Sequence, residues 1–295
     1  MTLATPDPAF APPRRSRTRP TEEPRWLRWT LTALVLVVLA ALVFAPLATV
    51  FVEALREGWR AAVESLGDRY ARAAILLTLT VAAVAVPLNA LFGIAAAWLL
   101  TKYRWRGKAW LLTLIDLPFS VSPIVAGLCI VLLFGANSTI GSVLLANGWP
   151  IVFAVPGIVL ATMFVTFPFV ARELVPLMAE QGTSEEEAAL TLGASGWRIF
   201  WTVTIPNIKW ALLYGVLLCN ARAMGEFGAV AVVSGRIRGD TATMPITIEM
   251  LYNEWASVAA FALAAVLTLL ALVTLALKTL LEWTHADQLS ATGRH

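Results

Sequence analysis

The chain has 295 residues, of which 59% are hydrophobic and 14% are charged, and its formal net charge is +3. A soluble domain has about 25% charged and 45–50% apolar residues, so this composition excludes an ordinary soluble domain and favours an integral membrane protein. The basic residues adjoin hydrophobic segments and form no stripe, which argues against a nucleic-acid-binding protein.

Residues 1–28 are rich in Pro and Arg and contain almost no large apolar residue before Trp26. Such a segment cannot bury enough apolar surface to fold, so we predict a disordered cytoplasmic tail. The apolar run that follows is longer than the core of a signal peptide, which predicts an uncleaved first span.

Six apolar segments follow, each long enough to cross the hydrocarbon of a bilayer as a helix. Helices are required because unpaired backbone groups cannot face lipid. The sequence therefore predicts an all-α, polytopic membrane protein, whose domain of residues 29–281 is followed by a cytoplasmic tail of residues 282–295. The predicted spans are residues 29–52, 73–100, 109–134, 151–171, 208–234 and 255–281. Prolines are expected to interrupt several of them, at Pro46, Pro87, Pro118, Pro123, Pro156 and Pro168.

The distribution of Lys and Arg beside the spans predicts the orientation. The N-terminal tail and the loop of residues 101–108 are basic, so both are expected in the cytoplasm, whereas the loop of residues 135–150 carries no charge and fits the outside. The arginines in residues 53–72 depart from this pattern, but the other loops outweigh them. Six spans then place both termini, and the loop between the fourth and fifth spans, in the cytoplasm.

That cytoplasmic loop, about residues 180–206, has the pattern of two short helices. Ser184 precedes Glu187 by three residues, the spacing of a capping box, and three glutamates occupy the first turn, where the helix dipole favours them. Gly193 is placed to end the first helix, and Ser195 to cap a second helix that carries Trp197. Pro206 can then open the fifth span. One reading of these features is an interfacial connector whose tryptophans lie at the lipid headgroups.

The spacing within the loop is more specific than its periodicity. Glu187-Ala188-Ala189 is followed after three residues by Gly193 and after nine more by Val203, Thr204, Ile205 and Pro206. This resembles the EAA loop of bacterial ABC importer permeases, E-A-A-x3-G-x9-I-x-L-P, with Val and Ile in place of Ile and Leu. The resemblance implies the type I permease fold, with a coupling helix that docks into a cleft on a cytoplasmic ATPase subunit. It further implies that Ala188, Ala189 and Gly193 make the close contact, as small residues in a helix-in-groove mode.

The chain lacks the G-x-x-x-x-G-K-[ST] phosphate loop, since its only Gly-Lys pair, Gly107-Lys108, is followed by Ala109. We therefore expect a transport subunit, not an enzyme, with ATP and Mg²⁺ held by a partner ATPase subunit. No cofactor or metal is expected on this chain: Cys129 and Cys219 lie in apolar segments, and His285 and His295 have no ligand cluster around them.

Ionisable residues inside predicted spans suggest a functional site. Arg222 and Glu226 are separated by four residues in span 5, so they share a helical face and can satisfy each other as a structural pair, or Arg222 can line an anion path. Gly225 and Gly228 beside them permit close helix packing. Asp116 in span 3 is a third such charge and a possible partner of Arg222. With Arg222 and Glu226 it also gives a remote alternative, the acid–base site of a membrane enzyme.

The run A-R-A-M-G-E-F-G at residues 221–228 resembles the sulfate/molybdate branch of these permeases. The continuation at residues 233–255 is similar to W-type sulfate/thiosulfate permease subunits, and less so to T-type subunits or molybdate permeases. The resemblance covers residues from span 1 to span 6 and implies import across a bacterial inner membrane. The implied partners are a T-type permease subunit, an ATPase dimer and a periplasmic sulfate-binding protein. Molybdate, tungstate or another oxyanion as substrate, and a homodimer of permeases, stay open as alternatives.

Overall fold

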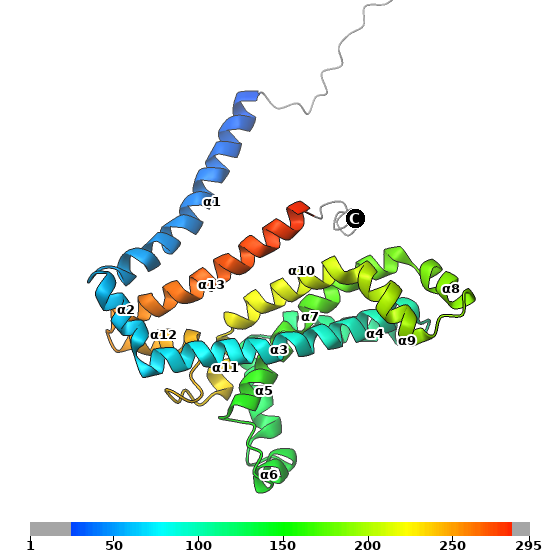
Figure 1. Ribbon diagram of the computed structural model, residues 1–295. Coiled ribbons are helices and arrows are strands. Elements are labelled where there is room, and N and C mark those ends of the chain that lie inside the picture. The colour runs from blue at the N-terminus through cyan, green and yellow to red at the C-terminus, as the bar shows by residue number, and fades with distance from the viewer. Residues whose placement is uncertain (1–24, 285–295) are drawn as a thin grey trace, which may run out of the picture. The chain divides into compact units, whose positions relative to one another are not determined.

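The computed structural model describes residues 25–284, and every regular element in that range is helical. Most of the predicted N-terminal tail and residues 285–295, with both histidines, lie outside this range. Figure 1 shows the helices in chain order. They are α1 (Arg25–Ala54), α2 (Trp59–Gly67), α3 (Arg69–Lys102), α4 (Lys108–Ser120), α5 (Pro123–Phe134), α6 (Thr139–Ala146), α7 (Val155–Gln181), α8 (Ser184–Thr191), α9 (Gly196–Ile199), the π-helical stretch η2 (Phe200–Thr204), α10 (Ile205–Met224), α11 (Gly228–Val233), α12 (Met244–Asn253) and α13 (Ser257–Thr284).

The chain divides into two units between Thr49 and Val50. The first unit contains most of α1, a 30-residue apolar helix that begins four residues before the predicted span. The second unit contains α2 to α13 and carries all the candidate site residues. The predicted all-α membrane fold is confirmed: five described helices are long and apolar enough to cross a bilayer, and the bent pair α4–α5 gives a sixth candidate.

Two of the six predicted spans are interrupted in the structure. The predicted span 109–134 is interrupted at its prolines as expected: it is bent by 108° between α4 and α5, because Pro118 and Pro123 flank the turn and the chain is extended at Val121 and Ser122. The expected span 208–234 ends at Met224 and resumes as the six-residue α11. The other expected proline breaks were wrong: Pro46, Pro87 and Pro168 lie inside continuous helices, and Pro156 lies in the first turn of α7.

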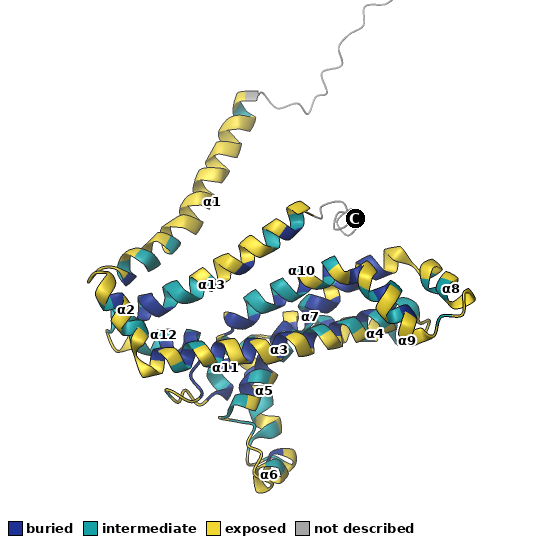
Figure 2. Cartoon of the chain, viewed as in Figure 1, coloured by how far each residue is buried: buried dark blue, intermediate teal, exposed yellow. Residues whose placement is uncertain are grey.

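The core of the second unit lies between α3, α7 and α10, and Figure 2 shows buried residues on these helices. Fully buried Val170 and Leu174 from α7 pack against Ile208 of α10 in this cluster. A polar contact crosses the same interface, because Asn89 of α3 donates to Thr166 Oγ1 of α7 at 2.7 Å. Buried polar groups of this kind are stable only when they are paired, so the contact fixes the register of α3 on α7.

The two interrupted spans meet each other at glycines. A Cβ added to Gly127 of α5 would lie 2.6 Å from the Ala229 carbonyl oxygen of α11, and one added to Gly228 would lie 3.0 Å from Pro123 Cβ. Only glycine permits α5 and α11 to approach this closely. The predicted close packing at Gly228 therefore involves α5, whereas Gly225 at the end of α10 has only the Ala221 carbonyl oxygen, 3.7 Å away, near such a Cβ.

We expect Gly127→Ala to destabilise the protein by about 1–3 kcal/mol, because the Ala229 backbone cannot move away without shifting α11. Thermal unfolding of the detergent-solubilised protein measures the change. The matched control is Gly67→Ala at the end of α2, where a Cβ meets nothing within 4 Å. An unchanged unfolding temperature for Gly127→Ala would contradict the packing described here.

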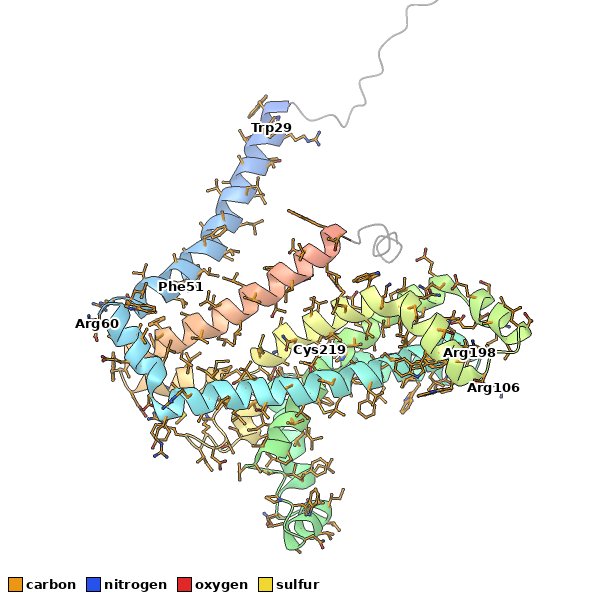
Figure 3. The ribbon with its side chains drawn as sticks, in the orientation of Figure 1. Trp29, Phe51, Arg60, Arg106, Arg198 and Cys219 are labelled. Atoms are coloured by element: carbon orange, nitrogen blue, oxygen red, sulfur yellow. The ribbon has the colours of Figure 1, made fainter. Side chains whose placement is uncertain are left out.

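The second unit presents two opposite ends (Figure 1). One end carries α8 and α9 beside the C-terminal end of α3, and the other carries α2 and the loops of residues 234–243 and 253–256. Figure 3 locates Arg106 and Arg198 at the first end and Arg60 at the second. The two loops predicted to be cytoplasmic, residues 101–108 and 180–206, thus lie at the same end.

Candidate functional site

The loop between α7 and α10 begins with α8, whose first turn contains Glu185, Glu186 and Glu187 as predicted. Its N-cap residue is Thr183, not Ser184, which is already helical, and the Thr183 side chain makes no capping hydrogen bond, so the predicted capping box was wrong. Thr183 Oγ1 donates to Glu187 Oε1 at 2.7 Å. Thr and Ser are both good caps, and Gly182, whose φ is +67, turns the chain immediately before Thr183.

Gly193 ends α8 as predicted. Its φ is +83, in the left-handed region that glycine adopts without a steric penalty. The Ala194 amide donates to the Ala189 carbonyl at 3.1 Å and the Gly193 amide to the Leu190 carbonyl at 2.9 Å, which is the bond pattern of a Schellman motif. A Cβ at Gly193 would meet nothing within 4 Å, so this position is open to a partner.

The second short helix was predicted with the correct cap, since the Ser195 hydroxyl accepts from the Arg198 amide at 3.4 Å. It was predicted to stop before span 5, and this was wrong. Helix α9 continues through η2 into α10, so residues 196–224 form one helical segment. Val203 lies in the π-helical stretch, and Ile205 and Pro206 are the first residues of α10. Within this continuous segment Pro206 has no amide to donate to the preceding turn, which is where the helix departs from regular α geometry.

Two of the three glutamates hold α8 to other elements. Glu186 Oε1 lies 2.7 Å from Lys102 Nζ at the end of α3, and Glu185 accepts a hydrogen bond from Asn207 Nδ2 in α10. These contacts join residues far apart in the sequence, and only the three-dimensional structure brings them together. The sequence predicted a helix-start role for both glutamates and missed the contacts to Lys102 and Asn207.

The outer surface of α8 is exposed and partly apolar. Glu187 and Ala188 are exposed, Ala189 is half-buried, and Leu192 at the C-cap is 88% exposed. Leu190 of α8 and Trp197 of the adjoining α9 are also exposed, so large apolar side chains lie beside a helix that begins with three carboxylates. An exposed apolar surface of this kind marks an interaction site.

Arg222 and Glu226 form an ion pair, with Nη1 and Oε2 2.6 Å apart. The side chain of Glu226 is 1% exposed and that of Arg222 35%. The other carboxylate oxygen of Glu226 accepts from the Ala229 amide at 2.9 Å, so it also bridges the break between α10 and α11. The sequence predicted that Arg222 and Glu226 share a helical face. Because α10 ends at Met224, Glu226 instead reaches Arg222 from the non-helical turn that follows the helix.

Asp116 is not the partner of Arg222. It lies on α4 and pairs with Arg172 of α7, whose Nε is 3.3 Å from Asp116 Oδ1. The Arg172 guanidinium also lies over the Phe119 ring, 4.9 Å from its centre. Arg172 lies on α7, which extends to Gln181, ten residues beyond the end of the predicted span 151–171. The structure therefore separates Asp116 from the Arg222–Glu226 pair, and an acid–base site built from these three residues receives no support.

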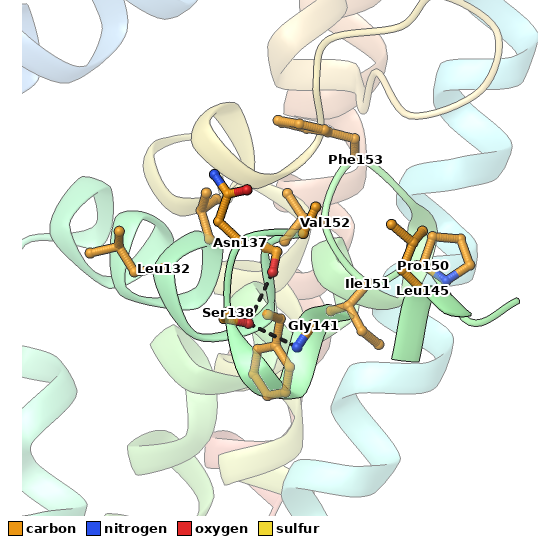
Figure 4. A pocket seen from close by; sticks show the side chains of 13 residues that line it. Leu132, Asn137, Ser138, Gly141, Leu145, Pro150, Ile151, Val152 and Phe153 are labelled. Carbon is orange, nitrogen blue, oxygen red and sulfur yellow. Dashed lines mark hydrogen bonds between the residues drawn. The ribbon is translucent and has the colours of Figure 1, made fainter. Parts of the chain in front are cut away.

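A hollow of about 560 Å³ lies where α5, α6 and residues 150–153 meet (Figure 4). Ser138 caps α6 there: its hydroxyl accepts from the Gly141 amide at 2.8 Å and donates to the Gly135 carbonyl at 2.9 Å. The lining residues include no charged side chain. Its polar side chains, Asn137 and Ser138, are neutral, and neutral donors bind an oxyanion more weakly than a guanidinium does, so this hollow fits an anion less well than Arg222.

The end of the unit opposite to α8 carries two further arginine pairs. Arg236 Nη1 lies 3.0 Å from Glu249 Oε2, and Arg238 donates to Glu254. The hydrogen bond from Arg238 holds the pKa of the exposed Glu254 carboxyl below its ordinary value. The stabilisation from this pair is therefore present above the ordinary pKa of a glutamate and is lost as the pH falls, and at an exposed site it is small.

Residues 89–283 match the family model described as "Binding-protein-dependent transport system inner membrane component". The chain is 53% identical over 269 residues to "Sulfate transport system permease protein CysW" of Synechocystis sp., which covers 91% of this chain and 95% of that protein. It is 49% identical over 263 residues to the protein of the same name from Escherichia coli K12, with 89% and 90% covered. The "Sulfate transport system permease protein CysT" of Escherichia coli K12 is 36% identical over 230 residues, with 78% and 83% covered.

Among solved structures, the fold is similar to a chain of a bacterial ABC transporter involved in the import of the acidic polysaccharide alginate. The TM-score is 0.65 at 16% sequence identity, and the match covers 88% of this chain and 94% of that one. At this identity the likeness concerns the fold alone.

Proposed function

The chain belongs to the family of binding-protein-dependent transport system inner membrane components, and from this premise we propose that it is the permease subunit of an ATP-driven sulfate importer. The observation that carries the proposal is the 53% identity over 91% of the chain to a sulfate transport system permease. The resemblance seen in the EAA spacing and in residues 221–228 is thereby confirmed. As a permease of this family the chain is a transport subunit of the inner membrane and not the ATPase.

The proposed complex contains a dimer of ATPase subunits that bind ATP and Mg²⁺, a second permease subunit of the T type and a periplasmic sulfate-binding protein. A doubly charged oxyanion cannot cross about 30 Å of hydrocarbon unaided, which is why a protein pathway and an energy source are both required. Both termini are proposed to be cytoplasmic. The common location of residues 101–108 and α8 at one end of the bundle supports this orientation.

We propose that α8 is the docking helix for the ATPase, with Glu187, Ala188, Ala189 and Gly193 at the contact. The exposure of Leu190 and Leu192 and the open space at Gly193 support this role. Val203, Ile205 and Pro206 serve a different purpose in the proposal, because they carry α9 into the span without a break.

The proposed anion path passes Arg222, at the break of the fifth span. Its guanidinium is partly exposed, whereas the Glu226 carboxylate that neutralises it is buried, so an incoming anion has access to Arg222 and not to Glu226. Gly225 and Gly228 provide the turn and the close approach to α5 that this break requires.

Purification of the tagged chain from its native membrane tests the assembly: we expect an ATPase, a second permease and a sulfate-binding protein to co-purify.

Uptake of labelled sulfate, with thiosulfate and molybdate as competitors, tests the substrate. We expect thiosulfate to compete with sulfate uptake at concentrations near that of sulfate, and molybdate to compete only in large excess. Preferential competition by molybdate would assign the complex to molybdate or tungstate instead.

A further inference from the structure

Lys102, the last residue of α3, contacts the docking loop at two points. Its ammonium lies 2.7 Å from Glu186 Oε1 of α8 and donates a hydrogen bond to the carbonyl of Gly182, the residue before the α8 cap. The Lys102 side chain is only 9% exposed. Lysine is rarely this buried unless it is paired, so the contact is a built feature of the fold and not an incidental surface ion pair.

A second contact lies one turn earlier on the same face of α3. The Trp98 ring stacks on Phe200 of η2, with centroids 4.8 Å apart and an interplanar angle of 6°. Thr204, also in η2, donates to Glu186 Oε1 at 3.4 Å. The end of α3 therefore contacts both α8 and η2, and Glu186 of α8 is bonded to both Lys102 of α3 and Thr204 of η2.

The chain on either side of α8 gives little mechanical connection of its own. Gly182 and Gly193 flank the helix at φ +67 and +83, and at neither position would a Cβ meet any atom within 4 Å. Rotation at these two residues meets little steric resistance. A displacement of α8 can therefore reach the bundle efficiently only through side-chain contacts. Helix α3 is well placed to receive this displacement, because α3 packs on α7 and α10 through the main core.

We propose that Lys102 is a positioning residue that makes α8 move together with α3, so that displacement of α8 by the ATPase reaches the transport path. This inference rests on the proposed function and adds the element that transmits the motion. A purely architectural Lys102 would affect assembly and stability alone. A transmitting Lys102 also sets how much sulfate moves for each ATP hydrolysed.

The experiment measures both quantities in complexes reconstituted in proteoliposomes, with Lys102→Met, Glu186→Gln and the reversed pair Lys102→Glu with Glu186→Lys. We expect the single variants to assemble and hydrolyse ATP, but to transport at least about fivefold less sulfate per ATP than wild type, the lower range of a typical coupling free energy. Stimulation of ATP hydrolysis by the sulfate-loaded binding protein should fall in parallel. The reversed pair restores the ion pair but not the hydrogen bond to the Gly182 carbonyl, so it should recover both quantities in part.

The matched control is Arg106→Met, which removes a cytoplasmic positive charge close to the end of α3 from an exposed side chain with no ion pair within residues 25–284. It should couple like wild type. Single variants with unchanged sulfate per ATP, a reversed pair that assembles but stays uncoupled, or single variants that do not assemble would each overturn the inference. If no ATPase co-purifies with the wild-type chain, the proposed function itself is contradicted. If the wild-type complex and its variants transport the same amount of sulfate per ATP hydrolysed, only this inference is contradicted.

Discussion

Gly193→Asp should abolish sulfate uptake and remove the ATPase subunit from the purified complex. Gly193 adopts φ +83, which costs an L-residue about 1–2 kcal/mol, and the new carboxylate would enter the proposed docking contact without a partner, at a cost of several kcal/mol. Since 1.4 kcal/mol changes affinity tenfold, the ATPase should bind at least about 100-fold more weakly. Co-purification of the ATPase and uptake of labelled sulfate measure the two effects.

Backbone strain alone is separated from docking by Gly148→Asp. Gly148 has a similar φ of +78, a Cβ there would also meet nothing within 4 Å, and it lies after α6 and outside the α8 loop. This control should retain both the ATPase and uptake. If the two variants lose uptake equally, or if Gly193→Asp retains the ATPase, the docking role of α8 is contradicted.

Arg222→Ala should lower sulfate uptake by at least about tenfold, but this variant alone cannot separate transport from folding. Removal of one partner of a buried ion pair typically costs 3–5 kcal/mol, because the other charge stays buried, and Glu226 is 1% exposed. The informative variant is Arg222→Met combined with Glu226→Gln. It removes both charges, and the glutamine carbonyl can still accept from the Ala229 amide, whose bond to Glu226 is 2.9 Å long.

If Arg222 lines the anion path, the double variant should assemble with the ATPase and hydrolyse ATP, yet transport sulfate at least tenfold more slowly than wild type. A purely structural pair predicts the opposite, with transport restored when both charges are removed. Measurement of assembly, ATP hydrolysis and uptake on the same preparation distinguishes the two results. Restored uptake would remove Arg222 from the proposed path.

The sequence predicted the features that depend on local chemistry. The first-turn glutamates, Gly193 as the helix end and Ser195 as a cap were confirmed, because capping and left-handed glycine conformations involve residues within a few positions of one another. The number of spans followed from apolar length, with the bent pair α4–α5 as the sixth. The family followed from the spacing of the EAA loop and was confirmed by the comparisons.

Features that depend on distant partners were not predictable. Asp116 was considered with Arg222, but the bundle places it beside Arg172 because α4 packs on α7. Lys102 was read only as a topology signal, although its ammonium is paired with Glu186, 84 positions later. The π-helical connection was also missed, since the periodicity of residues 196–206 fits two separate helices as well as one continuous helix.

The continuity of residues 196–224 has a consequence for how the length of this segment constrains its evolution. Successive residues of an α-helix are rotated by about 100°, and a π-helical turn accommodates one residue more than an α-helical turn. Loss of a single residue from Phe200–Thr204 would therefore convert this turn to regular α-helix and leave the direction of Trp197 relative to Arg222 nearly unchanged. Loss of a second residue has no such compensation and would rotate Trp197 and α8 by about 100° relative to Arg222, so this turn tolerates one deletion and not two.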